Sequence, residues 1–235
     1  MFVPLHDANP LKHIRAQYVT ISLIALNVFV FAFFQSDLFG ADMEETALSY
    51  GVIPAVLMDV QDLAPELVRI PEELTLVSYM FLHAGWLHLI GNMLFLWVFG
   101  DNVEDATGHF RFLDFYLACG ALAGLAHSWA MPESELPLVG ASGAVAGVIA
   151  AYLMLHPKVR VWVLLLWRFP LRLSAMWVLG FWVALQLFNV LVASPEDEIA
   201  WWAHVGGLGG GAALILFLRR PGVVLFDRGV AQSEA

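Results

Sequence analysis

The feature that most constrains this chain is a series of long apolar segments that follow one another almost from end to end. Six of them approach the length of about 20 apolar residues that a helix needs to cross a membrane. They cover residues about 17–36, 81–100, 110–130, 140–156, 173–193 and 201–218. Hydrophobic residues make up 60% of the chain and charged residues 14%, which is too little polar surface for a soluble domain. The sequence predicts an all-α integral membrane protein with six transmembrane helices.

Two further segments affect the predicted number of transmembrane helices. The stretch from Val161 to Arg172 is also apolar, but Arg168 and Pro170 interrupt it. We expect it to lie at the membrane interface rather than to span the membrane. The N-terminal residues lack the basic region, short apolar core and cleavage site of a signal peptide. We therefore expect the first apolar segment to remain in the mature protein.

The charged residues are divided unequally between the two sides that six spans create. One side receives the N-terminus, the second and fourth connections and the C-terminus, and it holds ten of the 11 basic residues: Lys12, Arg15, Arg111, Lys158, Arg160, Arg168, Arg172, Arg219, Arg220 and Arg228. The other side holds Arg69 together with Asp37, Asp42, Glu44, Glu45, Asp59, Asp62, Glu66, Glu72, Glu73, Glu133, Glu135, Glu196, Asp197 and Glu198. By the positive-inside rule, both termini are predicted to be cytoplasmic.

The first outer connection, residues about 37–80, is long for a link between two spans. It is amphipathic and is interrupted by Pro54, Pro65 and Pro71. We expect a partly helical element that lies at the outer membrane surface. Elsewhere, the single cysteine, Cys119, lies in an apolar run without basic neighbours, so it is predicted to be a core residue. The net charge of −10 argues against nucleic acid as a partner.

A hydroxyl and an imidazole are predicted to lie at one depth in the membrane. Ser142 is the third residue of the fourth segment and His204 is the fourth residue of the sixth, and both segments begin on the outer side. Both side chains therefore lie roughly 5–10 Å below the outer surface. Gly143 and Gly147, like Gly207 and Gly211, have the small-xxx-small spacing that lets helices approach closely. A neutral imidazole within hydrogen-bond reach can make a serine nucleophilic.

The second segment adds a polar pair at the same end. His88 and Asn92 are four residues apart, which places them on one face of a helix. Attack on a peptide carbonyl creates an oxyanion that needs hydrogen-bond donors. The imidazole of His88, the amide of Asn92 and the backbone N–H of Ser142 can supply them. His83 is predicted to lie nearer to water, at the mouth of the site.

The same polar residues also have simpler interpretations as packing residues or metal ligands. Serine in a membrane helix is usually a packing residue, whereas an ionisable residue such as His204 is usually functional. His88 and Asn92 could equally tie helices together, and Gln186 and Asn189 are better explained in that way. No H-E-x-x-H motif is present, and the five-residue separation of His83 and His88 does not place two metal ligands on one helical face. No acidic residue accompanies His204 in its segment, so a serine protease here would use a Ser–His dyad.

Several motifs together resemble the rhomboid family of intramembrane serine proteases. They are the sequences G-A-S-G at 140–143, A-H-V-G-G at 203–207, H-L-I-G-N at 88–92, and F-G-D-N-V-E-D at 99–105 followed by F-R-F-L-D-F-Y-L at 110–117. The resemblance covers essentially all six segments. Two positions depart from it: Val68 precedes Arg69 where many members have a Trp-Arg pair, and Ala146 stands where some members have an aromatic ring.

The resemblance implies a rhomboid-like six-helix bundle without an added seventh helix. It implies Ser142 as nucleophile, His204 as general base, and an oxyanion site at His88, Asn92 and the Ser142 N–H, with Gly140, Gly143, Gly207 and His83 in support. It implies cleavage of single-pass transmembrane proteins near the outer membrane boundary without a cofactor or metal. We expect the protein to reside in a bacterial cytoplasmic membrane. The alternative is an inactive relative that binds or escorts transmembrane clients. A transporter is a third option, but the sequence shows neither the paired intramembrane charges nor the inverted repeats that are typical of transporters.

Overall fold

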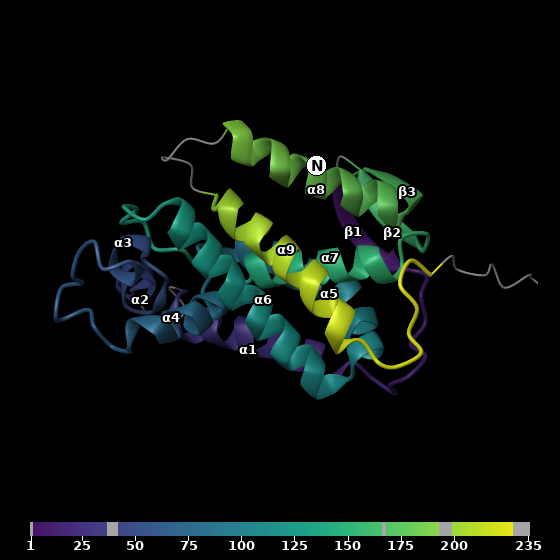
Figure 1. Cartoon of the computed structure of the whole chain (residues 1–235), viewed down its shortest axis with the longest axis horizontal. Coiled ribbons are helices and arrows are strands. Elements are labelled where there is room, and N and C mark those ends of the chain that lie inside the picture. The colour runs from purple at the N-terminus through teal and green to yellow at the C-terminus, as the bar shows by residue number, and fades with distance from the viewer. Residues whose placement is uncertain (1, 37–41, 166–167, 193–198, 228–235) are drawn as a thin grey trace, which may run out of the picture.

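The computed structural model describes residues 2–36, 42–165, 168–192 and 199–227 (Figure 1). Its long helices are α1 (Tyr18–Phe34), α5 (Trp86–Thr107), α6 (His109–Ala130), α7 (Ser142–Leu155), α8 (Ala175–Val192) and α9 (Trp201–Leu218). They lie on the six apolar segments, but α5 begins at Trp86, later than expected, and continues to Thr107. Asp37, Glu196, Asp197, Glu198 and Arg228 lie outside the described residues.

Helices α8 and α9 are each long and apolar enough to cross a membrane. Helix α5 and the helical stretch Glu72–Phe81 together have the length and apolar composition of one span, but they are bent by 84° at the break between them. Helices α1 and α7 are apolar but shorter, at 17 and 14 residues.

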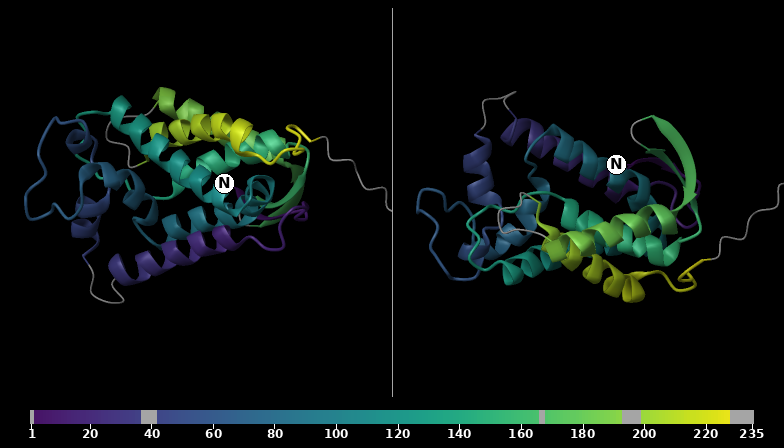
Figure 2. Two further views of the ribbon diagram at one scale, coloured as in Figure 1. Left: turned by 60° about the horizontal axis from the view of Figure 1, so that its bottom comes forward. Right: turned by 90° about the horizontal axis from the view of Figure 1, so that it is seen from above.

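The first long connection is partly helical, as the sequence predicts. It contains α2 (Met43–Tyr50), α3 (Pro54–Leu57), α4 (Glu72–Ser78) and the short 3-10 helix η2 (Tyr79–Phe81). The carboxylate of Asp42 caps α2 by accepting hydrogen bonds from the backbone N–H groups of Glu44 and Glu45, at 2.9 and 3.0 Å. These helices gather at one end of the bundle, on the left in Figure 1 (see also Figure 2).

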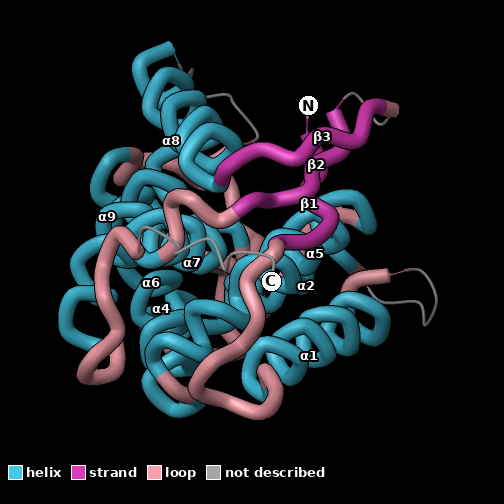
Figure 3. Tube along the Cα trace, turned by 90° about the vertical axis from the view of Figure 1, so that its right-hand side faces the viewer, coloured by secondary structure: helices cyan, strands magenta, loops and turns pink. Residues whose placement is uncertain are grey.

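A three-stranded antiparallel sheet stands at the opposite end, and here the all-α prediction is wrong (Figure 3). Its strands are β1 (Phe2–Asp7), β2 (Arg160–Leu165) and β3 (Phe169–Ser174), in the order β1-β2-β3. Val161 and Val163 are buried while Trp162 between them is exposed, so burial alternates with the period of a strand. The apolar stretch from Val161 to Arg172 is thus a hairpin, because β-branched and aromatic residues favour the pleated conformation.

Two buried carboxylates at the end of α5 hold the N-terminal segment against the bundle. Glu104 accepts hydrogen bonds from the N–H groups of Val19 and Thr20, at 3.0 and 2.8 Å, and so caps α1. Asp105 accepts from the N–H groups of Lys12, His13 and Ile14.

Glycines allow α9 to lie close against two neighbouring helices. A Cβ atom at Gly207 would stand 2.9 Å from the carbonyl carbon of Gly143, and one at Gly211 would stand 2.5 Å from the Cα of Gly147. Both distances are too short for real atoms, so α7 and α9 pack backbone to backbone. On its other side Gly206 faces α6, where a Cβ would lie 3.0 Å from the Leu122 carbonyl oxygen.

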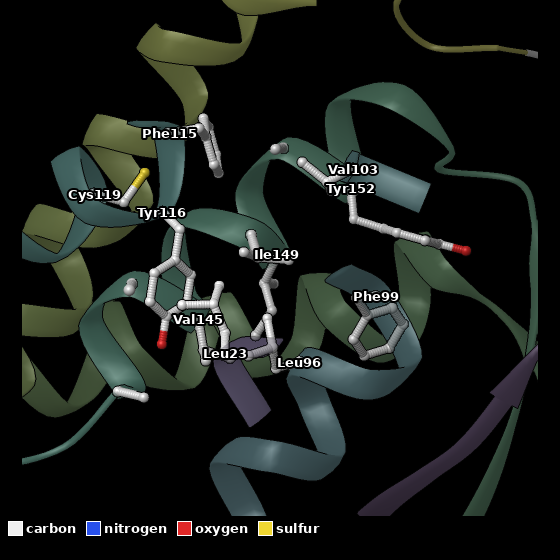
Figure 4. Packing of buried hydrophobic residues seen from close by; sticks show 14 of the residues in the cluster. Leu23, Leu96, Phe99, Val103, Phe115, Tyr116, Cys119, Val145, Ile149 and Tyr152 are labelled. Atoms are coloured by element: carbon white, nitrogen blue, oxygen red, sulfur yellow. The ribbon is translucent and has the colours of Figure 1, made fainter. Parts of the chain in front are cut away.

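The largest apolar core lies around α7, where residues of α1, α5 and α6 meet (Figure 4). Val145 and Ile149 of α7 belong to it together with Leu96 of α5 and Tyr116 of α6. Cys119 is fully buried there, as predicted for a core residue, and its Sγ occupies the space beside Gly147. The packing of α7 on three sides fixes where its first residue, Ser142, stands.

A pair of alanine substitutions in α9 tests the glycine contact. We expect Gly211→Ala to destabilise the fold by about 1–3 kcal/mol, because the new methyl group would overlap the backbone of Gly147. Gly209→Ala is the matched control, since nothing lies within 4 Å of its Cβ position. The two variants are compared by their thermal unfolding midpoints in the same detergent. Equal midpoints for the two variants would show that the α7–α9 contact is not tight.

Candidate active site

The structure brings Ser142 and His204 into hydrogen-bond contact. Ser142 is the first residue of α7, and His204 lies in the first turn of α9. The Oγ of Ser142 is 2.9 Å from Nε2 of His204. The imidazole is 8% exposed and the serine is half-buried, so the hydroxyl is the more accessible of the two. This contact rests on the glycine packing of α7 against α9.

The second ring nitrogen of His204 contacts a residue that the sequence interpretation assigned only to helix packing. Its Nδ1 is 2.8 Å from Oε1 of Gln186 on α8. The amide nitrogen of Gln186 donates to the Trp182 carbonyl oxygen at 3.1 Å, which turns the amide oxygen toward the imidazole. Because an amide oxygen only accepts hydrogen bonds, Nδ1 carries the proton and Nε2 is free to accept the proton of Ser142.

A signal for Gln186 was present in the sequence. In the six-span topology the fifth segment ends on the outer side, so Gln186 lies one to two turns below the same surface as His204. The depth comparison that selected Ser142 and His204 therefore also applies to Gln186. A carboxamide between helices is also common as a packing contact, so depth alone does not distinguish the two roles.

Two tryptophans enclose the imidazole of His204. The ring of Trp182, one turn before Gln186 on α8, lies with its centroid 5.9 Å from that of His204. The ring of Trp201 approaches edge-on, at 6.0 Å and 84°. These contacts supply the aromatic packing that Ala146 cannot give. Trp202 is 39% exposed, and no ring contact with His204 is found for it in the described structure.

His88 and Asn92 converge on the backbone two residues before Ser142. A Cβ atom at Gly140 would lie 2.8 Å from Nε2 of His88 and 3.8 Å from Nδ2 of Asn92. Gly140 also has a φ of +125°, which strains any residue with a side chain. Its N–H donates to the Tyr79 carbonyl oxygen at 3.0 Å, which fixes this loop. Glycine is required here for both reasons.

Both polar side chains present donors toward this loop. The Nδ1 of His88 lies 3.4 Å from the backbone nitrogen of Ala84 and accepts from it, which leaves Nε2–H as a donor. The buried Nδ2 of Asn92 has no hydrogen-bond partner among the described residues. As the first residue of α7, Ser142 has a backbone N–H without an acceptor inside the helix. Two side-chain donors therefore lie at the Gly140 loop that leads to Ser142, and the backbone N–H of Ser142 is a third.

His83 does not lie where the sequence interpretation placed it. Its side chain is fully buried rather than near water, and its ring centroid is 5.1 Å from that of His88. Helix α5 begins only at Trp86, so His83 lies in the connection between η2 and α5 and not on the helix. The backbone N–H of His83 donates to Gln35 at the end of α1, at 2.8 Å. His83 thus packs against the ring of His88, and neither of its ring nitrogens has a hydrogen-bond partner among the described residues.

The arrangement places a hydroxyl against an imidazole, with hydrogen-bond donors on the neighbouring loop, and such a combination suits acyl transfer. Within the described ranges, no group of three or more His, Cys, Asp or Glu side chains is placed to hold a metal ion. The site lies at the end of the bundle that carries α2, α3 and α4, because the segment before α7 pairs with that connection between Val52 and Leu138. Access from that end is consistent with the exposure of Ser142.

Comparisons with known proteins add independent information. Residues 71–221 match the family model described as the Rhomboid domain. Rhomboid-like protein 11, chloroplastic, of Arabidopsis thaliana is 43% identical over 74 residues, which are 32% of this chain and 26% of that protein. Rhomboid protease GluP of Bacillus subtilis is 32% identical over 149 residues, 63% of this chain and 27% of that protein. Putative rhomboid protease YdcA of the same species is 30% identical over 139 residues, covering 59% and 64%.

The role of Gln186 in holding the imidazole can be measured directly. We expect Gln186→Leu to remove the preference for the Nδ1–H tautomer of His204, because a leucine side chain accepts no hydrogen bond from Nδ1–H. Nitrogen-15 NMR of the histidine rings in detergent reports the tautomer. Asn189→Leu, which removes a half-buried amide from the same helix, is the control and should leave the His204 signals in place. An unchanged tautomer in Gln186→Leu would contradict the assignment.

Proposed function

Because this chain belongs to the rhomboid family, which is an integral membrane family whose members include named proteases, we propose that it is an intramembrane serine endopeptidase. Its substrates would be single-pass membrane proteins, cut within or next to their transmembrane segment. The chain spans 26%, 27% and 64% of the three relatives named above, so the proposal is drawn from this chain's own site.

The observation that carries the proposal is the hydrogen-bonded chain Ser142–His204–Gln186. In the first step, Nε2 of His204 takes the hydroxyl proton while Oγ of Ser142 bonds to the scissile carbonyl carbon. The imidazolium then gives this proton to the departing amine, and an acyl-enzyme remains. Water attacks the ester in the same way, with His204 again as base, and releases the new carboxyl end and the free serine.

The oxyanion formed in each step needs donors. We assign this role to Nε2–H of His88, Nδ2 of Asn92 and the backbone N–H of Ser142. The positive end of α7 adds to the stabilisation of negative charge. Gly140 keeps the space beside these donors open, since a side chain there would displace the ring of His88.

The membrane arrangement follows from the charge distribution. In this proposal α1, α5, α6, α7, α8 and α9 all span the membrane, both termini are cytoplasmic, and the dyad opens to the outer side. A substrate helix enters laterally near α5 and α8 and unwinds there, because a helical backbone protects its own carbonyl groups. We propose a bacterial cytoplasmic membrane as its location; relatives named as mitochondrial and chloroplastic also match the chain.

A fluorophosphonate probe separates an enzyme from an inactive relative. We expect the probe to label Ser142 in the natural chain, whereas Ser142→Ala and His204→Ala should remain unlabelled because each lacks one half of the dyad. Mass spectrometry identifies the modified residue. Cleavage of a model transmembrane substrate by folded Ser142→Ala would contradict the nucleophile assignment. Absence of labelling in the folded natural chain would favour an inactive, client-binding relative.

The oxyanion assignment predicts a partial loss of rate. For His88→Ala and Asn92→Ala we expect kcat to fall roughly 10–1000-fold, the usual cost of one lost oxyanion donor. Substrate cleavage in liposomes, with unfolding midpoints measured in parallel, gives the comparison. Unchanged rates in both variants would return the two residues to a packing role.

A further inference from the structure

We propose that the β2–β3 hairpin is a docking element for anionic phospholipids of the cytoplasmic leaflet. The side of the membrane rests on the topology proposed above, but the inference does not require that the chain be a protease. It concerns the sheet, which lies at the end of the bundle opposite α2, α3 and α4 (Figure 1; Figure 3 shows the strands themselves).

The inward face of the sheet extends beyond the helices that it packs on. In one row, Pro4 and Val163 are buried, whereas their neighbour Leu171 on β3 is 38% exposed. In the next row Val161 is fully buried and Leu173 is 42% exposed. The outermost strand, β3, therefore carries an apolar row that the described chain covers only in part.

This apolar row leads directly into a helix that is suited to lipid. Ser174 ends β3 and Ala175 begins α8, so no linker separates them. In the first turns of α8, Trp177 is 70% exposed and Phe181 is 60% exposed. Because α8 is long and apolar enough to cross a membrane, its first turn marks the level of the interface. Because β3 joins α8 directly, the hairpin lies at the level of the membrane interface and presents its apolar row to the lipid that surrounds the first turn of α8.

The charges of the hairpin select the kind of lipid. Between residues 156 and 193 the chain has four basic residues, Lys158, Arg160, Arg168 and Arg172, and no acidic residue. Arg172 pairs across the strands with exposed Trp162 on the outer face of the sheet. Arg168 stands over the ring of Phe169, at 5.9 Å from its centroid. Aromatic and basic side chains together are typical of the headgroup level, and arginines there attract anionic lipids.

The test places a fluorescent probe on the apolar row. Leu171→Cys is labelled in the full-length protein and reconstituted in nanodiscs that contain doxyl-labelled phosphatidylglycerol or doxyl-labelled phosphatidylcholine. Quenching by each lipid measures its local concentration at the hairpin. We expect phosphatidylglycerol to quench more strongly, and expect the preference to fall about fivefold for each of Arg160, Arg168 and Arg172 that is changed to glutamine.

Two further variants and a phosphate competitor serve as controls for the lipid preference. Arg69→Gln removes an exposed arginine at the opposite end and should leave the preference unchanged, while Arg172→Lys should retain it. Inorganic phosphate at equal ionic strength should not reduce it, because the site requires the acyl chains as well. Equal quenching by both lipids, or displacement by phosphate, would overturn the proposal. So would protection of the label from both lipids, which would assign the face to a second copy or a protein partner. None of these quenching measurements depends on proteolytic activity.

Discussion

The close approach of the α7 and α9 backbones is the constraint on which the rest of the site depends. Gly207 and Gly211 leave no room for a Cβ atom against Gly143 and Gly147, so the two helices meet at backbone distance. In a membrane, where apolar side chains gain little by leaving lipid, such contact is a main source of helix association. The same contact brings the first residue of α7 and the first turn of α9 together, and the Ser142–His204 hydrogen bond follows from it.

A neutral carboxamide occupies the place that a carboxylate takes in a soluble catalytic triad. Burying a charge in a low-dielectric bundle is costly, whereas an amide oxygen fixes the imidazole tautomer without that cost. Gln186 can do so because its own amide nitrogen is satisfied within α8 by the Trp182 carbonyl. The candidate site is consequently shared by three helices: α7 gives the hydroxyl, α9 the imidazole and α8 the amide that contacts it.

The two ends of the bundle are built by different means. At the end of the candidate site, neutral polar groups converge on the Gly140 loop, with the helices of the first connection beside it. At the other end the carboxylates of Glu104 and Asp105 bind the N-terminal segment, and β1 joins the hairpin into a sheet. Because β3 continues directly into α8, the sheet is covalently and structurally connected to the helix that bears Gln186.

Apolar length and composition are local properties, so they predict where the six long helices lie from the sequence, with α5 shifted to Trp86–Thr107. The sequence also selects Ser142 and His204, since topology sets the depth of a residue without knowledge of its neighbours. Which side chains touch depends instead on how separate segments pack. β1 cannot be matched to β2 from the sequence because most of the chain separates them, whereas the adjacent strands β2 and β3 carry a local signal in their β-branched and aromatic residues. The buried place of His83 and the contact of Gln186 with His204 depend on where separate segments pack, and no local pattern encodes that.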